Sequence, residues 1–453
     1  MIKKLCLTLI LWVIASQAYA TSLYYINRTD KPILINFSVE SSAPVSNGYQ
    51  YRLTENDLVI WPYQKAKVAD FNRYYGIVNG ATYNYFLTIS RLTDKGTWEV
   101  KPQEPVAQLK LVGHGSGTTL SYGYKGQGMM TDYNPYILHR YNQDGYHSEF
   151  GVKAVYTSGF DDVEFVVSEH TTNDTEYEPN ILNVASYNLW LLPSVSSNIA
   201  GRASIMNHSL SGFDVLALQE AFSSDRDILF NKLADEYPYR TQVVGGKSNA
   251  LYDGGVVTFS RHPIIETDSI VFEHCTGTDC YADKGVVYTK INKDGEIYHI
   301  FNTHLASFNT PSAKRLRRLR RLQLGLMRTF MLTKGIPANE AVIYAGDFNI
   351  DKNSDFLEYL LMLATLDVDP PEFRGYTRAT FDPTINPYAA YKYSGGADVE
   401  YLDYVFVSRV HRRAVSNTNT VKLNQRLNSE TWGSWHLSDH FAIDANFVFS
   451  PNE

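Results

Sequence analysis

The pattern of apolar and polar positions divides the chain into two parts. From residue 21 to about 170, apolar and polar residues alternate in short stretches such as "KPILINFSV" and "VAQLKLVG". Turn-forming residues separate these stretches, and no long segment shows the period of about 3.6 residues that marks a helix. The pattern predicts an all-β, sandwich-like domain over residues 21–170, followed by a polar linker at residues 171–180.

The second part, residues 181–453, predicts a mixed domain. Apolar strands such as "ILNVASYNLW" and "EAVIYAGDFNI" alternate with amphipathic segments, of which residues 224–238 and 313–332 predict helices. The apolar face of the longer helix is predicted to hold Leu316, Leu319, Leu322, Leu326 and Phe330. Many strands with few helices favour an α+β fold in which two packed sheets carry helices on their outer faces.

Composition and charge narrow the class of protein. The 453 residues are 44% hydrophobic and 20% charged, which suits two globular domains. The formal net charge of -7 argues against a dedicated nucleic-acid-binding protein, because such proteins usually carry a basic excess. Residues 1–20 combine two early lysines, an apolar stretch and a final "AYA", which is typical of a secretory signal peptide. We therefore expect a secreted, extracellular protein.

Two cysteines remain after the predicted signal peptide. Cys275 and Cys280 lie close together in "CTGTDC". In an exported chain this spacing predicts a local disulfide. A metal-binding pair is the alternative, but no histidine or second cysteine pair nearby completes four ligands.

Polar side chains follow the ends of most strands predicted in the second part. Each residue taken singly has an ordinary explanation as a turn or cap residue. Together, carboxylates, amides and histidines suit a divalent cation and a phosphate, and a histidine paired with an aspartate can serve as the base for a hydrolytic water. The set consists of Asn188, Glu220, His304, Asp347, Asn349, Asp403, Asp439 and His440.

The motifs around these residues resemble a known superfamily. "SYNLW", "LQEAF", "THL", "GDFN", "LDY" and "SDH", in this order over roughly residues 181–450, resemble the endonuclease/exonuclease/phosphatase superfamily. The longer stretches "DGGVVTFSRHPIIE", "DKGVVYTKI", "ATFDPT" and "VEYLDYVFVS" are similar to the bacterial secreted neutral sphingomyelinases, the sphingomyelinase C family. The resemblance implies a DNase I-like four-layer α/β/β/α sandwich over residues 181–453. It also implies an Mg²⁺-dependent hydrolysis of sphingomyelin to ceramide and phosphocholine, with Mn²⁺ or Co²⁺ expected to substitute.

The resemblance further implies a metal ligand set and a base. Glu220 would be the central Mg²⁺ ligand, with Asn188 beside it. His440 would deprotonate the attacking water, Asp403 would hold the histidine in its tautomer and orientation, and Asp439 would close the site.

The remaining roles concern the phosphate. Asp347 would orient the water or the phosphate, while Asn349 and His304 would bind phosphate oxygens and stabilise charge on the leaving alkoxide. Asp382, in "TFDPT", would support the site from outside the set that touches substrate.

Two features depart from the family pattern. At the family's peripheral metal site the matching positions are Ser224, Tyr252 and Asp253, so Asp253 alone keeps a carboxylate for a second metal. The family's long aromatic hairpin before "SDH" is shorter here. Its Trp432 and Trp435 would either anchor at a membrane surface, where indole rings are favoured, or pack within the loop.

The segment "KRLRRLRRLQ", residues 314–323, is strongly basic. It either binds anionic lipid or phosphate, or forms the solvated face of the predicted helix, and the pattern favours the solvated face.

The sequence therefore predicts a secreted sphingomyelin phosphodiesterase that contacts membrane surfaces as a monomer, and a haemolysin or virulence role is implied by resemblance alone. Nucleic acid is not an expected partner. Two alternatives stay open. One is a secreted metal-dependent nuclease on the same fold, and the other is a membrane- or glycan-binding effector that acts through the N-terminal β domain.

Overall fold

The computed structural model divides the chain into two compact units, residues 1–170 and 171–453. The predicted signal peptide and most of the predicted linker lie outside the described residues. The described residues are 22–29, 32–44, 51–53, 58–62, 64–71, 77–92, 98–99, 106–114, 117–126, 129–131, 137–143, 146–156, 162–170, 178–245, 250–307, 312–375, 377–392, 398–424 and 436–451.

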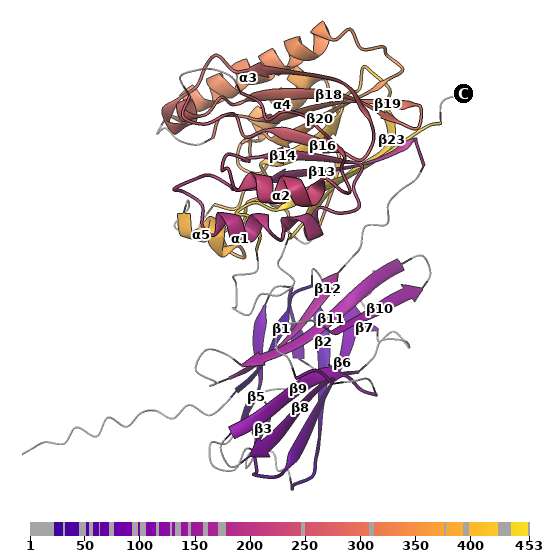
Figure 1. Ribbon diagram of the computed structural model, residues 1–453, viewed down its shortest axis with the longest axis vertical. Helices are drawn as coiled ribbons and strands as arrows, with labels where there is room; N and C mark the ends of the chain where they lie inside the picture. Colours follow the sequence, from indigo (N-terminus) through magenta and orange to yellow (C-terminus); the bar gives the residue numbers. More distant parts are fainter. Residues whose placement is uncertain are drawn as a thin grey trace, which may run out of the picture. The chain divides into compact units, whose positions relative to one another are not determined.

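The N-terminal unit consists of two six-stranded sheets (Figure 1). One sheet has the order β10-β11-β12-β1-β5-β3, and the other runs β4-β2-β6-β8-β9 with β7 paired to β6. The strands are β1 (Ser22–Asn27), β2 (Ile33–Ser41), β3 (Tyr51–Leu53), β4 (Leu58–Ile60), β5 (Lys65–Phe71), β6 (Thr82–Leu92), β7 (Trp98–Glu99), β8 (Ala107–His114), β9 (Gly117–Tyr124), β10 (Ile137–Gln143), β11 (Tyr146–Tyr156) and β12 (Val163–His170).

A shared core joins these two sheets. Along β8, Ala107, Leu109 and Leu111 are buried and the residues between them are half-buried, as strand alternation requires. Leu23 and Tyr25 of β1, on the other sheet, belong to the same apolar cluster. The two sheets therefore pack face to face, and the strand-rich N-terminal region agrees with the alternating pattern of the sequence.

The C-terminal unit holds a seven-stranded sheet, β15-β16-β14-β13-β24-β23-β21, and a five-stranded sheet, β17-β18-β19-β20-β22. Its strands are β13 (Ile181–Asn188), β14 (Val215–Gln219), β15 (Tyr239–Arg240), β16 (Val257–Ser260), β17 (Ile264–Val271), β18 (Gly285–Lys293), β19 (Glu296–His304), β20 (Ala341–Asp347), β21 (Glu372–Gly375), β22 (Asp403–Val407), β23 (Ala414–Lys422) and β24 (Ala442–Phe449). Its helices are α1 (Ile199–Ala203), α2 (Arg226–Leu233), α3 (Ala313–Thr333), α4 (Phe356–Leu366) and α5 (Pro387–Lys392), with 3₁₀ turns η1 (Met206–Ser209) and η2 (Gly277–Tyr281).

Alternating side chains sort these elements into layers. On β14, Val215 and Ala217 belong to the core between the two sheets, whereas Leu216 and Leu218 pack in a second cluster with residues of α1 and α2. On the other sheet, Phe330 of α3 packs edge-on against Phe301 of β19. Helices thus cover the outer face of each sheet, as Figure 1 shows for α3 and α4 on one side and α1 and α2 on the other.

Helix α3 turns a different face to the sheet from the one predicted. Leu316, Leu319 and Phe330 are buried as expected, but Leu322 and Leu326 are exposed. The side that packs against the sheet and against α4 is instead completed by Arg320, Gln323, Leu324, Met327 and Met331. The leucine pattern alone was misleading because α3 also packs sideways on α4, which rotates the buried stripe toward residues that ion-pair with that helix.

Among the residues that the structure describes, no helix has both the length and the apolar character needed to cross a bilayer.

Candidate active site

Strand register brings the predicted residues to one edge of the two sheets. The parallel pair β13 and β14 ends with Asn188 opposite Gln219, and Glu220 follows directly. On the facing sheet, His304 at the end of β19 lies opposite Asp347, which in turn lies opposite Asp403 at the start of β22. Because strands fix the directions of their terminal side chains, residues far apart in the sequence converge here.

Asp347 is the meeting point of three polar side chains. Its Oδ2 accepts a 3.0 Å hydrogen bond from Asn188 Nδ2. The same oxygen lies 3.5 Å from His304 Nε2 and 3.9 Å from His440 Nε2. A carboxylate in this position can accept a hydrogen bond from a water that lies between the two imidazoles.

Two of the predicted site residues adopt the left-handed backbone conformation that non-glycine residues rarely use. Glu220 has φ of 53° and Asn349 has φ of 51°. The Asn349 N–H donates to Asp347 Oδ1 at 3.0 Å, and its side-chain amide donates to the carbonyl of Leu305 at 3.2 Å. Phe348, between Asp347 and Asn349, is fully buried and points away into the core.

His440 and Asp403 form a buried pair. His440 Nδ1 lies 2.8 Å from Asp403 Oδ2, and the aspartate is fully buried. The contact leaves Nε2 of His440 on the side of Asp347. An imidazole held in this way by a carboxylate is oriented to accept a proton at Nε2.

Burial and mutual repulsion govern protonation at this edge. Burial raises the pKa of Asp347 to about 7, with the charge of Asp403 adding to the shift. Burial likewise raises the pKa of Asp439 to about 7 and that of Glu220 above its usual value. For His440, burial alone would lower the pKa, but the charges of Asp403 and Asp347 outweigh it and hold the pKa well above the ordinary value.

The same carboxylates fit a divalent cation. Glu220 Oε2 is buried and accepts no hydrogen bond from any described residue. One oxygen or nitrogen from each of Asp347, Asp403 and His440 also lies within 4.8 Å of the others, a spacing suited to a metal. A cation here would offset the negative charge of these carboxylates, and Mg²⁺, which prefers carboxylate oxygens, suits the donor set.

The side chain of Asn188 does not make the contact expected of a metal ligand. Its Nδ2 donates to Glu220 Oε1 at 3.2 Å and to Asp347, while its Oδ1 accepts from the Trp190 N–H at 3.0 Å. In this arrangement the amide holds the two carboxylates together, and its oxygen faces the turn after β13.

Lys284 is a site residue that sequence reasoning missed. Its buried ammonium lies 3.1 Å from His304 Nε2 and 3.0 Å from Asp279 Oδ1. After burial, the Lys284 charge is the strongest influence that lowers the pKa of His304. An ammonium can only donate, so His304 Nε2 accepts and the ring proton lies on Nδ1. Lys284 belongs to the stretch "DKGVVYTKI" that resembles the family. Its position beside a strand does not indicate, however, that it contacts His304.

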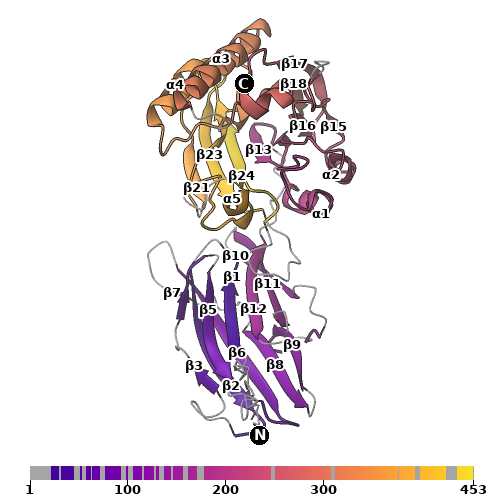
Figure 2. The same ribbon diagram turned by 90° about the vertical axis from the view of Figure 1, so that its left-hand side faces the viewer.

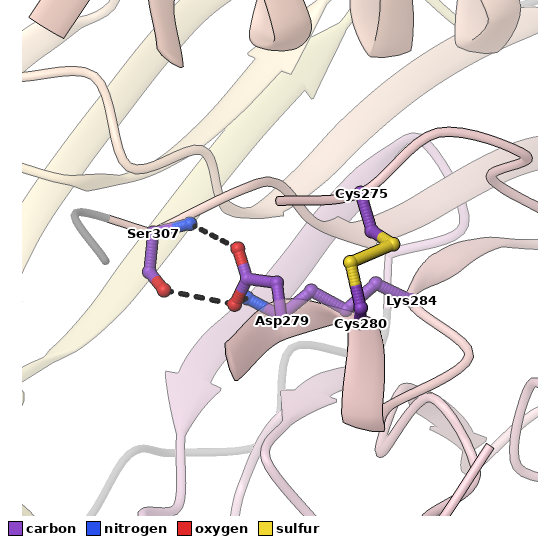
Figure 3. Close-up of a disulfide and its surroundings, with 5 residues drawn as sticks. All are labelled: Cys275, Asp279, Cys280, Lys284 and Ser307. Atoms are coloured by element: carbon purple, nitrogen blue, oxygen red, sulfur yellow. Dashed lines mark hydrogen bonds and ion pairs between the residues drawn. A yellow bond between two sulfur atoms is a disulfide. The ribbon is translucent and has the colours of Figure 1, made fainter. Parts of the chain in front are cut away.

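A disulfide-closed turn holds this lysine (Figure 3). Cys275 and Cys280 are bonded to each other, as predicted, across η2. Asp279 within that turn accepts from the N–H and from the hydroxyl of Ser307, both at 2.9 Å, in addition to its contact with Lys284. The turn thereby connects the segment after β19 with the segment before β18.

Arg202 is a second residue that the sequence did not single out. It is fully buried and donates to the carbonyls of Leu189 and Leu437, each at 2.8 Å. These contacts tie the turn after Asn188 to the segment before Asp439. Nothing in the local sequence distinguishes this arginine from a solvated one.

The remaining predicted residues lie at different distances from this edge. The carboxylate of Asp382 accepts hydrogen bonds from Thr384 and Thr377, and the neighbouring Phe381 packs edge-on against the His440 ring. Asp439 accepts a 3.2 Å hydrogen bond from the Ser438 hydroxyl. Trp432 and Trp435 lie outside the described residues.

The carboxylate of Asp253 is already paired with an arginine side chain. Its Oδ2 accepts from Arg226 Nη1 at 2.6 Å, and its Oδ1 accepts from the Gly255 N–H at 3.1 Å. The same Arg226 nitrogen donates to the carbonyl of Ala221 at 2.6 Å. The arginine therefore stands where a peripheral metal would need the Asp253 carboxylate, next to the turn that carries Glu220.

Comparisons with known proteins place this geometry in a family. Residues 185–440 match the Endonuclease/Exonuclease/phosphatase family. Sphingomyelinase C from Listeria ivanovii is 32% identical over 306 residues, which are 61% of this chain and 89% of that protein. Sphingomyelinase C 2 from Leptospira interrogans is 33% identical over 316 residues, which are 63% of this chain but 50% of that protein. The chain thus spans about half the length of the Leptospira relatives it matches.

Solved structures give the same result. The crystal structure of SmcL matches with a TM-score of 0.54 and 32% identity, over 60% of this chain and 100% of that one. A beta toxin mutant from Staphylococcus aureus with bound magnesium ions matches with a TM-score of 0.55 and 29% identity, over 60% of this chain and 99% of that one. The predicted DNase I-like fold of the C-terminal part is therefore confirmed.

Proposed function

The chain belongs to the Endonuclease/Exonuclease/phosphatase family and to its sphingomyelinase C branch, and on this premise we propose that it hydrolyses sphingomyelin to ceramide and phosphocholine. The observation that carries the proposal is the buried contact of 2.8 Å between His440 and Asp403, with His440 Nε2 directed toward Asp347. A base oriented in this way beside further phosphate-binding groups suits the hydrolysis of a phosphodiester.

The proposed reaction is attack of water on phosphorus with departure of the ceramide oxygen. His440 Nε2 takes the proton of the water, and Asp403 stabilises the imidazolium that forms. Asp347 holds the water in line with the phosphorus. Asn349 and the Nδ1–H of His304 donate to phosphate oxygens, since Nδ1 has no other partner among the described residues. The proton that the ceramide oxygen needs on leaving returns from solvent or from His440.

Mg²⁺ is the proposed cofactor, and Glu220 with its uncommitted Oε2 is its proposed principal ligand. When bound, the cation would supply positive charge to the phosphate oxygens as their negative charge grows. Lys284 contributes a fixed positive charge to the same region and keeps His304 neutral, so that this histidine donates without acting as an acid.

Secretion, contact with membrane sphingomyelin and a haemolytic role are part of the same proposal. The sphingomyelinase C relatives support the choice of lipid over nucleic acid. The role of the N-terminal unit, the monomeric state and the membrane role of the two tryptophans stay predictions.

The test is release of phosphocholine from sphingomyelin in neutral mixed micelles by the purified protein. Release should require Mg²⁺, stop with EDTA and fall at least a thousandfold in His440→Ala. His262→Ala is the matched control, because His262 also contacts an aspartate, Asp214 at 2.7 Å, but at the opposite end of β14. Phosphatidylcholine and DNA serve as rival substrates. Cleavage of DNA without release of phosphocholine would refute the proposal and favour the nuclease alternative.

A further inference from the structure

Helices α3 and α4 lie side by side on the outer face of the five-stranded sheet (Figure 2). Ion pairs join them at a nearly constant offset along the sequence, so the helices run parallel. These pairs connect Arg317 to Asp355, Arg320 to Glu358 and Arg328 to Asp367. They commit three of the arginines of α3 to α4, and they neutralise the carboxylates between the helices.

The other cations of the first half of α3 are exposed and have no carboxylate partner among the described residues. They are Lys314, Arg315, Arg318 and Arg321. Lys314, Arg318 and Arg321 follow the spacing i, i+4, i+7, which places them on one stripe of the helix. The basic segment is therefore divided in function: one side holds α4, and the other presents uncompensated positive charge to solvent.

Large apolar side chains lie exposed beside this charge. On α4, Phe356 is 60% exposed, Leu357 66% and Leu360 43%. On α3, Leu322, one helical turn after Arg318, and Leu326 are also exposed. Exposed apolar groups gathered on one face indicate a site of interaction with an apolar phase or partner.

The position of this surface connects it with the proposed active site. Helix α3 begins at Ala313, shortly after His304 ends β19, and α4 begins at Phe356, shortly after Asp347 ends β20. The first turns of both helices therefore lie at the edge of the sandwich that carries the converging polar residues. A flat partner that touches these turns would also lie close to that edge.

We propose that the α3–α4 face, defined as Lys314, Arg315, Arg318, Arg321, Leu322, Phe356, Leu357 and Leu360, docks onto a bilayer that contains anionic phospholipid. Cations next to exposed leucine and phenylalanine side chains suit such an interface. The charges can reach lipid phosphates while the apolar groups enter the headgroup boundary. A nucleic acid would use the cations but would leave the leucines exposed to water. The proposal rests on the proposed function only in that a lipid substrate makes docking useful.

Vesicle sedimentation tests docking separately from catalysis. The protein carrying His440→Ala is mixed with vesicles of phosphatidylcholine and sphingomyelin, with or without phosphatidylglycerol, at low and high salt. Binding should require phosphatidylglycerol and weaken as salt rises. Each cation near the surface contributes about a fivefold gain in binding, so Arg318→Gln with Arg321→Gln should weaken binding about 25-fold. Leu357→Ser with Leu360→Ser should weaken it about tenfold.

Matched controls change the same chemistry elsewhere. Lys232→Gln with Arg240→Gln removes two exposed cations near α2, and Leu251→Ser with Val415→Ser removes two exposed apolar side chains. Both control pairs should bind as the parent does, and all variants should keep the parent's melting temperature within a few degrees.

Several outcomes would overturn the proposal. Equal binding by the α3–α4 variants and the controls would refute it, as would binding that ignores phosphatidylglycerol. DNA binding lost in Arg318→Gln with Arg321→Gln, without vesicle binding by the parent, would assign the face to nucleic acid instead. Vesicle binding that depends on this face, without phosphocholine release by the wild-type protein, would support docking and refute the proposed activity.

Discussion

Replacing Asp403 with asparagine should remove most of the catalytic rate and leave the fold intact. Asp403 is fully buried, and its Oδ2 contacts His440 Nδ1 at 2.8 Å. With an effective dielectric constant of about 20, the attraction between an aspartate and an imidazolium at this distance is about 6 kcal/mol. The asparagine oxygen still accepts from Nδ1–H, so part of the orientation survives. We expect a loss of about 4 kcal/mol in transition-state stabilisation, which is about a thousandfold in kcat.

The pH profile gives a second, independent readout of the same change. The charge of Asp403 is the largest of the influences that raise the pKa of His440 against the effect of burial. Its removal should lower the pKa of His440, so the base form persists to lower pH. The acidic limb of kcat/KM should therefore move to lower pH even though the maximum falls.

Asp214→Asn is the matched control for this experiment. Asp214 is also buried and paired, with His262 at 2.7 Å and Lys293 at 3.0 Å, but it lies at the opposite end of β14. This variant should lower the melting temperature and keep kcat within about twofold. A kcat of Asp403→Asn within tenfold of wild type, or an acidic limb that does not move, would refute the assignment of His440 as the oriented base.

Four further predictions follow from the site. Glu220→Gln should raise the Mg²⁺ concentration for half-maximal activity at least tenfold, and a titration unchanged from wild type would place the metal elsewhere. Because the pKa of Asp347 is raised to about 7, the stability of the metal-free protein should fall as the pH rises from about 4 to about 7. Mg²⁺ should therefore raise the melting temperature, measured by calorimetry, more at pH 8 than at pH 5. Lys284→Met should raise the pKa of His304, measured by NMR, and lower kcat more than tenfold; an unmoved pKa would argue against the contact. Arg226→Gln should make Mg²⁺ activation biphasic by freeing the predicted peripheral site, and a single phase in both proteins would argue against this role.

Much of the active-site edge could be predicted from the sequence because strand ends are local features. The motif "GDFN" places Asp347 and Asn349 directly after a buried strand, whatever the rest of the chain does. Asp403 of "LDY" and His440 of "SDH" could be predicted to form a pair because their motifs occur in the order that the family shows. The structure brings them to 2.8 Å.

Other contacts could not be predicted because they depend on which side chain lies opposite across the fold. Lys284 and Arg226 look like ordinary solvated cations in the sequence. In the structure Lys284 contacts His304, and Arg226 forms an ion pair with Asp253. The choice of partner for a long, flexible cation is decided by its three-dimensional neighbours, and sequence spacing carries no information about them.

Helix α3 shows the same division within one element. The sequence by itself predicted that residues 313–332 form an amphipathic, strongly basic helix. The tertiary structure alone decided that Arg317 and Arg320 turn to α4 while Leu322 turns to solvent. Periodicity specifies which residues share a face, but the helix is free to rotate about its axis until its packing partners are in place. Those partners come from strands and a second helix elsewhere in the chain.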